Sequence, residues 1–305
     1  MCDPIPGRES VQGPVHVPVL LGPVLDYLDL RPGLVVVDGT VGAGGHAQHI
    51  LERIQPGGRL IGLDRDPMML AHARHALTQP DRYLLQASYA ELARVLSGLG
   101  MTAIDRLLLD LGLSSDQLAD ASRGFSFDSN GPLDMRFDTS HGPTAADVIN
   151  RLPEVELARI LFEYGDERHS RRIARRIVAA RPLRTAAALA DLVRRAVPRP
   201  RSRQRIHPAT RVFQALRIAV NDELDALRTL LHDQLPRVLR TGGRAVVISF
   251  HSLEDRIVKQ AFRDRECWES LTRKPVVADE AEIRANPRSR SAKLRAAVSK
   301  GQQTT

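Results

Sequence analysis

The chain has 305 residues, 43% of them hydrophobic, which excludes a mostly disordered protein and allows one large domain or two ordinary ones. There is no run of about 18 apolar residues, and residues 1–15 lack an apolar signal core, so we expect a cytoplasmic protein without a membrane segment. Only two cysteines are present, so we expect neither a disulfide framework nor a metal site. The net charge is +8, but a GC-rich genome also enriches arginine, so the placement of the arginines is more informative than their number.

The first third of the chain alternates short apolar runs with helical patterns. We expect strands at Leu34–Asp38, Arg59–Asp64, Tyr83–Ala87 and Arg106–Asp110, and helices at His46–Ile54 and Pro67–Leu77. Alternation of this kind predicts a doubly wound α/β sheet with parallel strands.

The middle of the chain has a different pattern. Residues 114–143 are rich in Gly, Ser, Asp and Phe without a sustained period, which predicts a long ordered loop region. Helical spacing follows at Val155–Tyr164, at Ile173–Val178 and, after a Thr185 cap, at Leu189–Val193. Three helices without a strand predict an inserted helical domain, with Pro198–Pro208 as its exit linker.

The sheet resumes near the C-terminus. A helical stripe runs from Phe213 to Leu231, a buried strand is expected at Arg244–Phe250, and Lys293–Val298 is expected as a last, antiparallel edge strand. We therefore divide the chain into flexible tails at 1–15 and 299–305, a discontinuous sheet domain at 16–117 and 209–298, and a helical, Arg-rich domain at 118–208.

The strongest local feature is the Gly-rich segment Asp38–His46, which lies where a strand ends and a helix begins. Glycines there allow a tight turn and a close approach of the backbone to a ligand. Asp64 ends the next strand, 20 residues after Gly44, where an acid can accept hydrogen bonds from ribose hydroxyls. A dinucleotide, S-adenosylmethionine and a turn without any ligand all fit this pattern. The glycine spacing differs from G-x-G-x-x-G, and Asp110 joins Asp38 and Asp64 on the rim of the same crevice, which favours the cationic methyl donor.

Arginines concentrate in the predicted insertion. Residues 168–211 contain 14 arginines and one acid, Asp191, which predicts a positive field that attracts nucleic acid. The arginines near 171–176 alternate with apolar residues and also suit the solvated face of a helix. Four arginines in the polar linker lack that explanation and are predicted to contact RNA phosphates: Arg199, Arg201, Arg203 and Arg205.

Seven sequence segments together resemble the bacterial MraW/RsmH family. They are His16–Leu20, Asp38–His46, Leu109–Gln117, Arg123–Phe127, Gly131–Arg136, His207–Gln214 and Ser249–Arg256, and the resemblance extends from about His16 to Val298. The resemblance implies a class I, Rossmann-like methyltransferase sheet interrupted by an all-α domain. It also implies S-adenosyl-L-methionine as cofactor and N4-methylation of a cytidine in the decoding region of 16S ribosomal RNA, within the small ribosomal subunit.

The family's cofactor positions map onto seven residues of this sequence: Gly44, Gly45, His46, Asp64, Tyr89, Asp110 and Gln117. Gly44, Gly45 and His46 resemble the loop that contacts the methionine end and ribose, and Asp64 resembles the ribose acceptor. Tyr89 stands where the family commonly has Phe near the adenine, so the ring face is kept and a hydroxyl is added.

The transfer itself requires help, because an exocyclic amine conjugated with a pyrimidine ring is a poor nucleophile. A carboxylate that accepts its N–H bonds supplies that help, and Asp110 is our candidate. The acid-Pro-Pro-aromatic motif of many amino methyltransferases is absent, since Leu-Gly-Leu follows Asp110.

The target base must also leave its stack, and aromatic residues usually hold it. Phe125, Phe127 and Phe250 are candidates, although core packing is the commoner role of a Phe. His251, Glu254 and Asp255 follow the last parallel strand. They either border the pocket or form a helix cap with Ser252 as the capping residue and Asp255 at its third position.

Two other functions stay open at the level of sequence. An NAD(P)-dependent oxidoreductase would place Arg65, beside Asp64, on a 2′-phosphate, and a non-catalytic RNA-binding assembly factor would keep the fold without turnover. The sequence also leaves open whether the substrate is free RNA or an assembled subunit, and whether the chain forms a homodimer.

Overall fold

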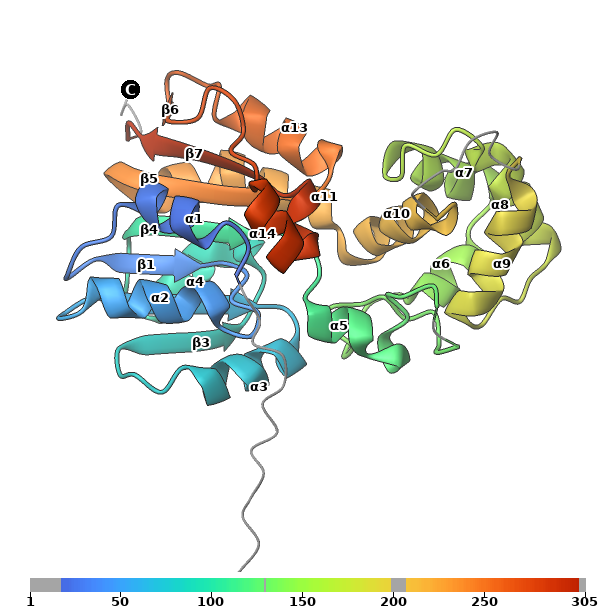
Figure 1. Ribbon diagram of the computed structural model, residues 1–305, viewed down its shortest axis with the longest axis horizontal. Helices are drawn as coiled ribbons and strands as arrows, with labels where there is room; N and C mark the ends of the chain where they lie inside the picture. The colour runs from blue at the N-terminus through green and yellow to red at the C-terminus, as the bar shows by residue number, and fades with distance from the viewer. Residues whose placement is uncertain (1–17, 129, 199–206, 302–305) are drawn as a thin grey trace, which may run out of the picture.

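The computed structural model describes residues 18–128, 130–198 and 207–301, and a seven-stranded sheet in the order β3-β2-β1-β4-β5-β7-β6 lies at its centre (Figure 1). The five parallel strands are β3 (Arg82–Gln86), β2 (Arg59–Asp64), β1 (Val35–Asp38), β4 (Ile104–Asp110) and β5 (Leu239–Ser249). Each of the five expected parallel strands is present, so the α/β prediction is confirmed.

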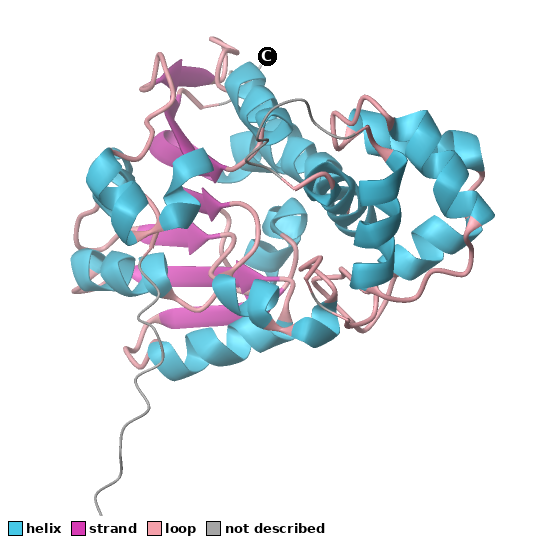
Figure 2. Cartoon of the chain, turned by 45° about the vertical axis from the view of Figure 1, so that its right-hand side comes forward, coloured by secondary structure: helices cyan, strands magenta, loops and turns pink. Residues whose placement is uncertain are grey.

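These strands are apolar along most of their length because helices cover both faces of the sheet (Figure 2). Successive residues of β4 point to opposite faces. Leu107 and Leu109 pack with α4 (Leu92–Gly98), α11 (Glu223–Thr229), α12 (Leu235–Val238) and α13 (Ser252–Ala261). Leu108 packs with α1 (Leu21–Leu28), α2 (Gly45–Ile54) and α3 (Pro67–Ala76), and α14 (Glu280–Ala285) adds Ile283 to this second layer.

The C-terminal edge differs from the prediction. β7 (Lys293–Ser299) is antiparallel to β5 as expected, but it is not the edge, because β6 (Trp268–Ser270) pairs with its last three residues. A strand of three residues is too short to leave a readable pattern. The predicted C-terminal tail also begins too early, since Ser299 is 3% exposed and the Lys300 N–H donates to the carbonyl of Cys267. The predicted tail residues 1–15 and 302–305 lie outside the described residues.

Five helices form a separate layer beyond the carboxyl ends of the strands (Figure 1). They are α6 (Ala145–Arg151), α7 (Glu154–Glu163), α8 (Ser170–Ala179), α9 (Ala186–Ala196) and α10 (Ala209–Asn221). The three expected helices correspond to α7, α8 and α9, and the Thr185 hydroxyl caps α9 by accepting the Ala188 N–H. α6 was not expected. None of the helices in the described ranges has the length and apolarity needed to cross a membrane.

The packing boundary between the two layers lies at Asp222. The helical stripe expected from Phe213 to Leu231 breaks there, because Asp222 adopts a left-handed conformation with φ 49°. Phe213, before the break, packs in the helical cluster, whereas Leu224, after it, packs against the sheet. Ile218 near the end of α10 already packs in the sheet cluster, so the return to the sheet is complete at Asp222 and does not begin at residue 209. α11 then continues through one π-helical segment, Leu230–Gln234, into α12.

The segment between β4 and α6 is an ordered loop region, as expected, with only short helical pieces at α5 (Ser115–Ala119) and residues 121–123. Buried polar contacts hold it. The Arg123 guanidinium lies 2.8 Å from the Asp66 carboxylate, and the Asn221 side chain donates to the Met135 carbonyl and accepts the Phe137 N–H. These contacts attach the helical layer to the sheet beside the carboxyl ends of the strands.

Candidate active site

A cavity opens where β1, β2, β4 and β5 end, and the loops that follow these strands form most of its lining. In a parallel α/β sheet this is the usual position of a ligand. Six of the seven sequence-predicted cofactor residues line the cavity: Gly45, His46, Asp64, Tyr89, Asp110 and Gln117.

The Gly-rich segment forms the turn from β1 into α2. Gly42 has φ 54° and donates its N–H to the Asp64 carboxylate at 3.0 Å. Gly44 has φ 93° and is the N-cap residue of α2, and a Cβ at this position would meet Leu77 at 3.1 Å, so Gly44 shapes the turn from behind the cavity. Asp38, which the sequence placed on the rim, is 1% exposed. Burial raises its pKa to about 8.

Asp64 is held rigidly at the end of β2. One carboxylate oxygen accepts the Gly42 N–H and the other accepts the Asp66 N–H at 2.9 Å. Burial raises the pKa of Asp64 to about 6, and these backbone donors oppose the rise. Each oxygen keeps capacity for a further donor, so the geometry suits a pair of ligand hydroxyls.

His46 and Asp110 face each other across the Gly-rich turn. The Nε2 of His46 donates to the Val19 carbonyl at 2.9 Å, and burial lowers the pKa of His46 to about 4, so the ring is neutral at physiological pH. Its Nδ1 therefore carries a lone pair, 3.6 Å from the Asp110 carboxylate. Asp110 itself is fixed through its N–H, which donates to the Thr40 hydroxyl at 2.7 Å. Two acceptors this close suit a donor-rich cation.

Tyr89 and Gln117 complete the predicted set. Tyr89 follows β3, and burial raises the pKa of its phenol. Gln117 forms a capping box with Ser114 at the start of α5 and donates to the Asp66 carboxylate at 2.8 Å. Both are fixed by contacts within the chain, so the cavity is largely preformed.

Three charged residues of the cavity escaped the sequence analysis or were left undecided there. Glu223 begins α11, Glu254 lies in the first turn of α13, and Arg288 comes from the C-terminal segment Pro287–Ser291. Arg288 reaches across the cavity to donate to the Ser115 hydroxyl at 2.8 Å. Glu254 lies in a segment that the sequence analysis singled out, whereas only the fold brings Glu223 and Arg288 to the strand ends, so no local motif reveals those two.

The α13 cap differs from the expected one. His251, rather than Ser252, is the capping residue, and Glu254 rather than Asp255 is its third-position partner. Glu254 borders the cavity. Asp255 instead pairs with Arg295 at 2.6 Å and with Lys293 at 3.7 Å, both on β7.

The aromatic candidates are placed differently from one another. Phe125 packs in the core of the helical layer and does not belong to the lining of the cavity. Phe127 stacks on His207 with ring centroids 4.5 Å apart. Phe250 lines the cavity beside Gly112. Arg199, Arg201, Arg203 and Arg205 lie outside the described residues.

Arg65 also lines the cavity, but its guanidinium donates to the carbonyl of Asn221. This contact within the chain engages one nitrogen of the guanidinium that an NADP-dependent enzyme would direct at a 2′-phosphate.

Comparison with known proteins identifies the family. Residues 14–300 match the model of the MraW methylase family. A protein of Syntrophotalea carbinolica named ribosomal RNA small subunit methyltransferase H is 54% identical, over 92% of this chain and 96% of its own length. The protein of the same name from Deinococcus radiodurans is 50% identical, over 92% of this chain and 88% of its own.

Among solved structures, an rRNA methylase from Streptococcus thermophilus is 10% identical, with a TM-score of 0.44, over 96% of this chain and 100% of its own. The match to the family model covers nearly the whole sheet and the helical layer. The chain belongs to the MraW methylase family.

Proposed function

We propose that this protein is an rRNA methyltransferase that transfers the methyl group of S-adenosyl-L-methionine to N4 of one cytidine in the decoding region of 16S ribosomal RNA. The observation that carries the proposal is the preformed cavity at the strand ends, built from the Gly-rich turn and acids of three elements, in a chain of a methylase family. The names of its relatives support ribosomal RNA of the small subunit as the substrate class.

The cofactor is S-adenosyl-L-methionine, and different residues bind its ribose, its methionine end and its adenine. The Asp64 carboxylate accepts the ribose hydroxyls. The ammonium of the methionine end donates to the Nδ1 of His46 and to the Asp110 carboxylate. These two acceptors lie 3.6 Å apart, which is close enough for both to contact one cation. The Tyr89 ring borders the adenine, and Gln117 and Gly45 close the walls. Gly44 acts through the turn that begins α2.

Asp110 is also our proposed acceptor for the amine of the target cytosine. It ends β4, and in this family's reaction the amine nitrogen must lie in line with the methyl carbon and sulfur. Asp110→Asn, measured separately for S-adenosylhomocysteine affinity and for turnover, tests this role. Turnover equal to that of the wild type would remove it.

RNA is bound by the helical layer in this proposal. The linker arginines Arg199, Arg201, Arg203 and Arg205 contact phosphates, and Phe127 stays a candidate base contact, whereas the burial of Phe125 favours a packing role. The protein acts in the cytoplasm on the small subunit or its RNA.

Two assays separate this function from the alternatives. Isothermal titration should show binding of S-adenosylhomocysteine and none of NADP, the reverse of what an oxidoreductase predicts. Methyl transfer from labelled S-adenosylmethionine to undermethylated small subunits should then be catalytic. Binding of RNA without any transfer would instead identify a non-catalytic assembly factor.

A further inference from the structure

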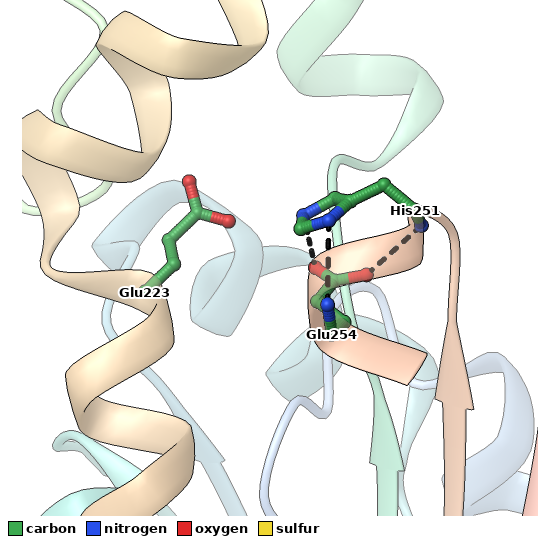
Figure 3. Close-up of side chains that lie close together, drawn as sticks. All are labelled: Glu223, His251 and Glu254. Atoms are coloured by element: carbon green, nitrogen blue, oxygen red, sulfur yellow. Dashed lines mark hydrogen bonds and ion pairs between the residues drawn. The ribbon is translucent and has the colours of Figure 1, made fainter. Parts of the chain in front are cut away.

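Two glutamates form an acidic corner of the cavity on the side opposite the Gly-rich turn. Glu223 begins α11 and Glu254 lies in the first turn of α13, both in the helix layer that also packs against Tyr89. Figure 3 shows Glu223 reaching toward Glu254 and His251 from the neighbouring helix, and ligand atoms of the three residues lie within 4.8 Å of one another.

The three residues have the chemistry of metal ligands, but the corner already holds its own cation. The Arg217 guanidinium donates to both oxygens of Glu223, at 2.8 and 2.9 Å. A metal ion would have to displace this bidentate ion pair. We therefore assign the corner to an organic substrate and not to a metal ion.

Glu254 is held differently from Glu223. One of its oxygens accepts the N–H of Phe250 at 2.8 Å and, more weakly, that of His251 at 3.3 Å. The other oxygen lies 2.9 Å from the Nε2 of His251. Burial alone would raise the pKa of Glu254, but His251, Arg217 and the Phe250 N–H together hold it below the usual value. Glu254 is therefore an ionised carboxylate with a fixed orientation at the cavity wall.

The position of Glu254 relative to the sheet matters for the transfer. β4 and β5 are neighbours, with Asp110 paired to Ile248, so Asp110 and the loop that leads to Glu254 leave the sheet side by side. The Gly-rich turn lies on the β1 side of Asp110 and takes the cofactor in the proposed function. The β5 side, walled by Phe250 and Glu254, is left for the substrate.

We propose that Glu254 is a catalytic residue that accepts an N–H of the target cytosine amine and takes the proton that methyl transfer releases. This inference rests on the proposed function. A glutamate accepts a hydrogen bond from cytosine N4 but repels the O4 carbonyl of uracil, so the same contact selects cytosine.

The transfer balances with these groups. The N4 lone pair attacks the methyl carbon, an N–C bond forms, and the C–S bond breaks with its electron pair staying on sulfur. N4 then carries the methyl, two hydrogens and a positive charge. Loss of one proton to Glu254 restores the conjugation of N4 with the ring. Because this conjugation is regained, the positively charged N4 is a much stronger acid than a carboxyl group. A weakly basic carboxylate is therefore sufficient.

The test uses the full chain and small subunits isolated from a strain that lacks this gene. Glu254→Gln keeps an oxygen for the Phe250 N–H but removes the charge and the basic site. With cofactor and subunits saturating, we expect the single-turnover rate to fall about 100-fold or more. Affinities for S-adenosylhomocysteine and for subunits should stay within about twofold, which also shows that the site is folded.

Asp225→Asn is the matched control, because it removes a carboxylate from the first turn of α11 where the side chain is 69% exposed; it should keep the wild-type rate. A wild-type rate for Glu254→Gln would overturn the inference. A loss of S-adenosylhomocysteine affinity that matches the loss of rate would also overturn it, since Glu254 would then belong to the cofactor site. If the wild type itself leaves the cytidine unmodified, the proposed function fails together with the inference.

Discussion

The buried carboxyl group of Asp38 makes the stability of this fold depend on pH in a predictable way. Asp38 ends β1 and is 1% exposed. Burial raises its pKa from 3.8 to about 8. The hydrogen bond from the Thr40 N–H opposes this rise in pKa, and the charges of Asp110 and Asp64 add to it. The folded state thus binds the proton more tightly than the unfolded state. The resulting stability is complete below pH 3.8 and is lost as the pH rises toward about 8.

Asp38→Asn removes this dependence with little change of shape. An asparagine oxygen still accepts the Thr40 N–H, which lies 3.2 Å from the Asp38 carboxylate. Each pH unit between the two pKa values costs the wild type about 1.4 kcal/mol, so the stability of the variant relative to the wild type should grow by roughly 2–3 kcal/mol from about pH 5 to about pH 7. That change corresponds to about 5 °C in Tm for a chain of this size.

Urea unfolding of both proteins without cofactor, at several pH values across this window, measures the difference directly. Titrating groups that do not interact with Asp38 affect both proteins equally and cancel. Asp120→Asn is a flat control, because hydrogen bonds from the Ser122 side chain and backbone lower the pKa of Asp120, so this group titrates below the window and its stability difference from the wild type should not change with pH there. A stability difference between Asp38→Asn and the wild type that stays constant with pH would refute the reasoning.

Three further predictions concern the loop region, the cofactor and RNA. Gly124→Ala should lower Tm strongly, because φ is +70° and the new Cβ would lie 2.1 Å from the Pro132 carbonyl. Gly142→Ala, with φ +82° and open space, should lower the free energy of unfolding by only about 1–2 kcal/mol. Equal decreases in Tm for the two variants in thermal unfolding would contradict this. S-adenosylhomocysteine affinity should fall as the pH drops through about 6, where Asp64 becomes protonated, and titration calorimetry should find this fall absent in Asp64→Asn. Charge reversal of the four linker arginines, 199 to 205, should weaken RNA binding and flatten its salt dependence without changing cofactor affinity, and unchanged RNA affinity would remove them from the interface.

Four of the five parallel strands, β1, β2, β4 and β5, were predictable because they are buried on both faces. Such strands are continuous apolar runs, as at Arg59–Asp64, and their ends are marked by acids or glycines. The short elements were not predictable. β6 has three residues and α14 has six, so each spans fewer than two periods of its pattern and no repeat can be read.

The break at Asp222 shows a different limit of sequence reading. The apolar stripe from Phe213 to Leu231 continues through the break, because both helices it contains are amphipathic. What changes is the surface against which the stripe packs. Only a left-handed residue at the junction turns the chain from the helical layer to the sheet, and an aspartate gives no clear signal of that conformation.

The candidate site divides in the same way. The Gly-rich turn, Asp64 and Asp110 carry local signals, since each stands where a strand ends. Glu223 and Arg288 have no such signal, and they reach the cavity because α11 and the segment after α14 pack beside the strand ends. Residues that join a site through tertiary packing are the ones that a single sequence hides.

The central claim is that this chain methylates N4 of one cytidine in 16S ribosomal RNA. Mass spectrometry of nucleosides and fragments of that RNA, from a strain lacking this gene and from the same strain complemented with it, tests the claim most directly. The account predicts that one N4-methyl group on a decoding-region cytidine is missing in the first strain and restored in the second. An unchanged methylation pattern would contradict it.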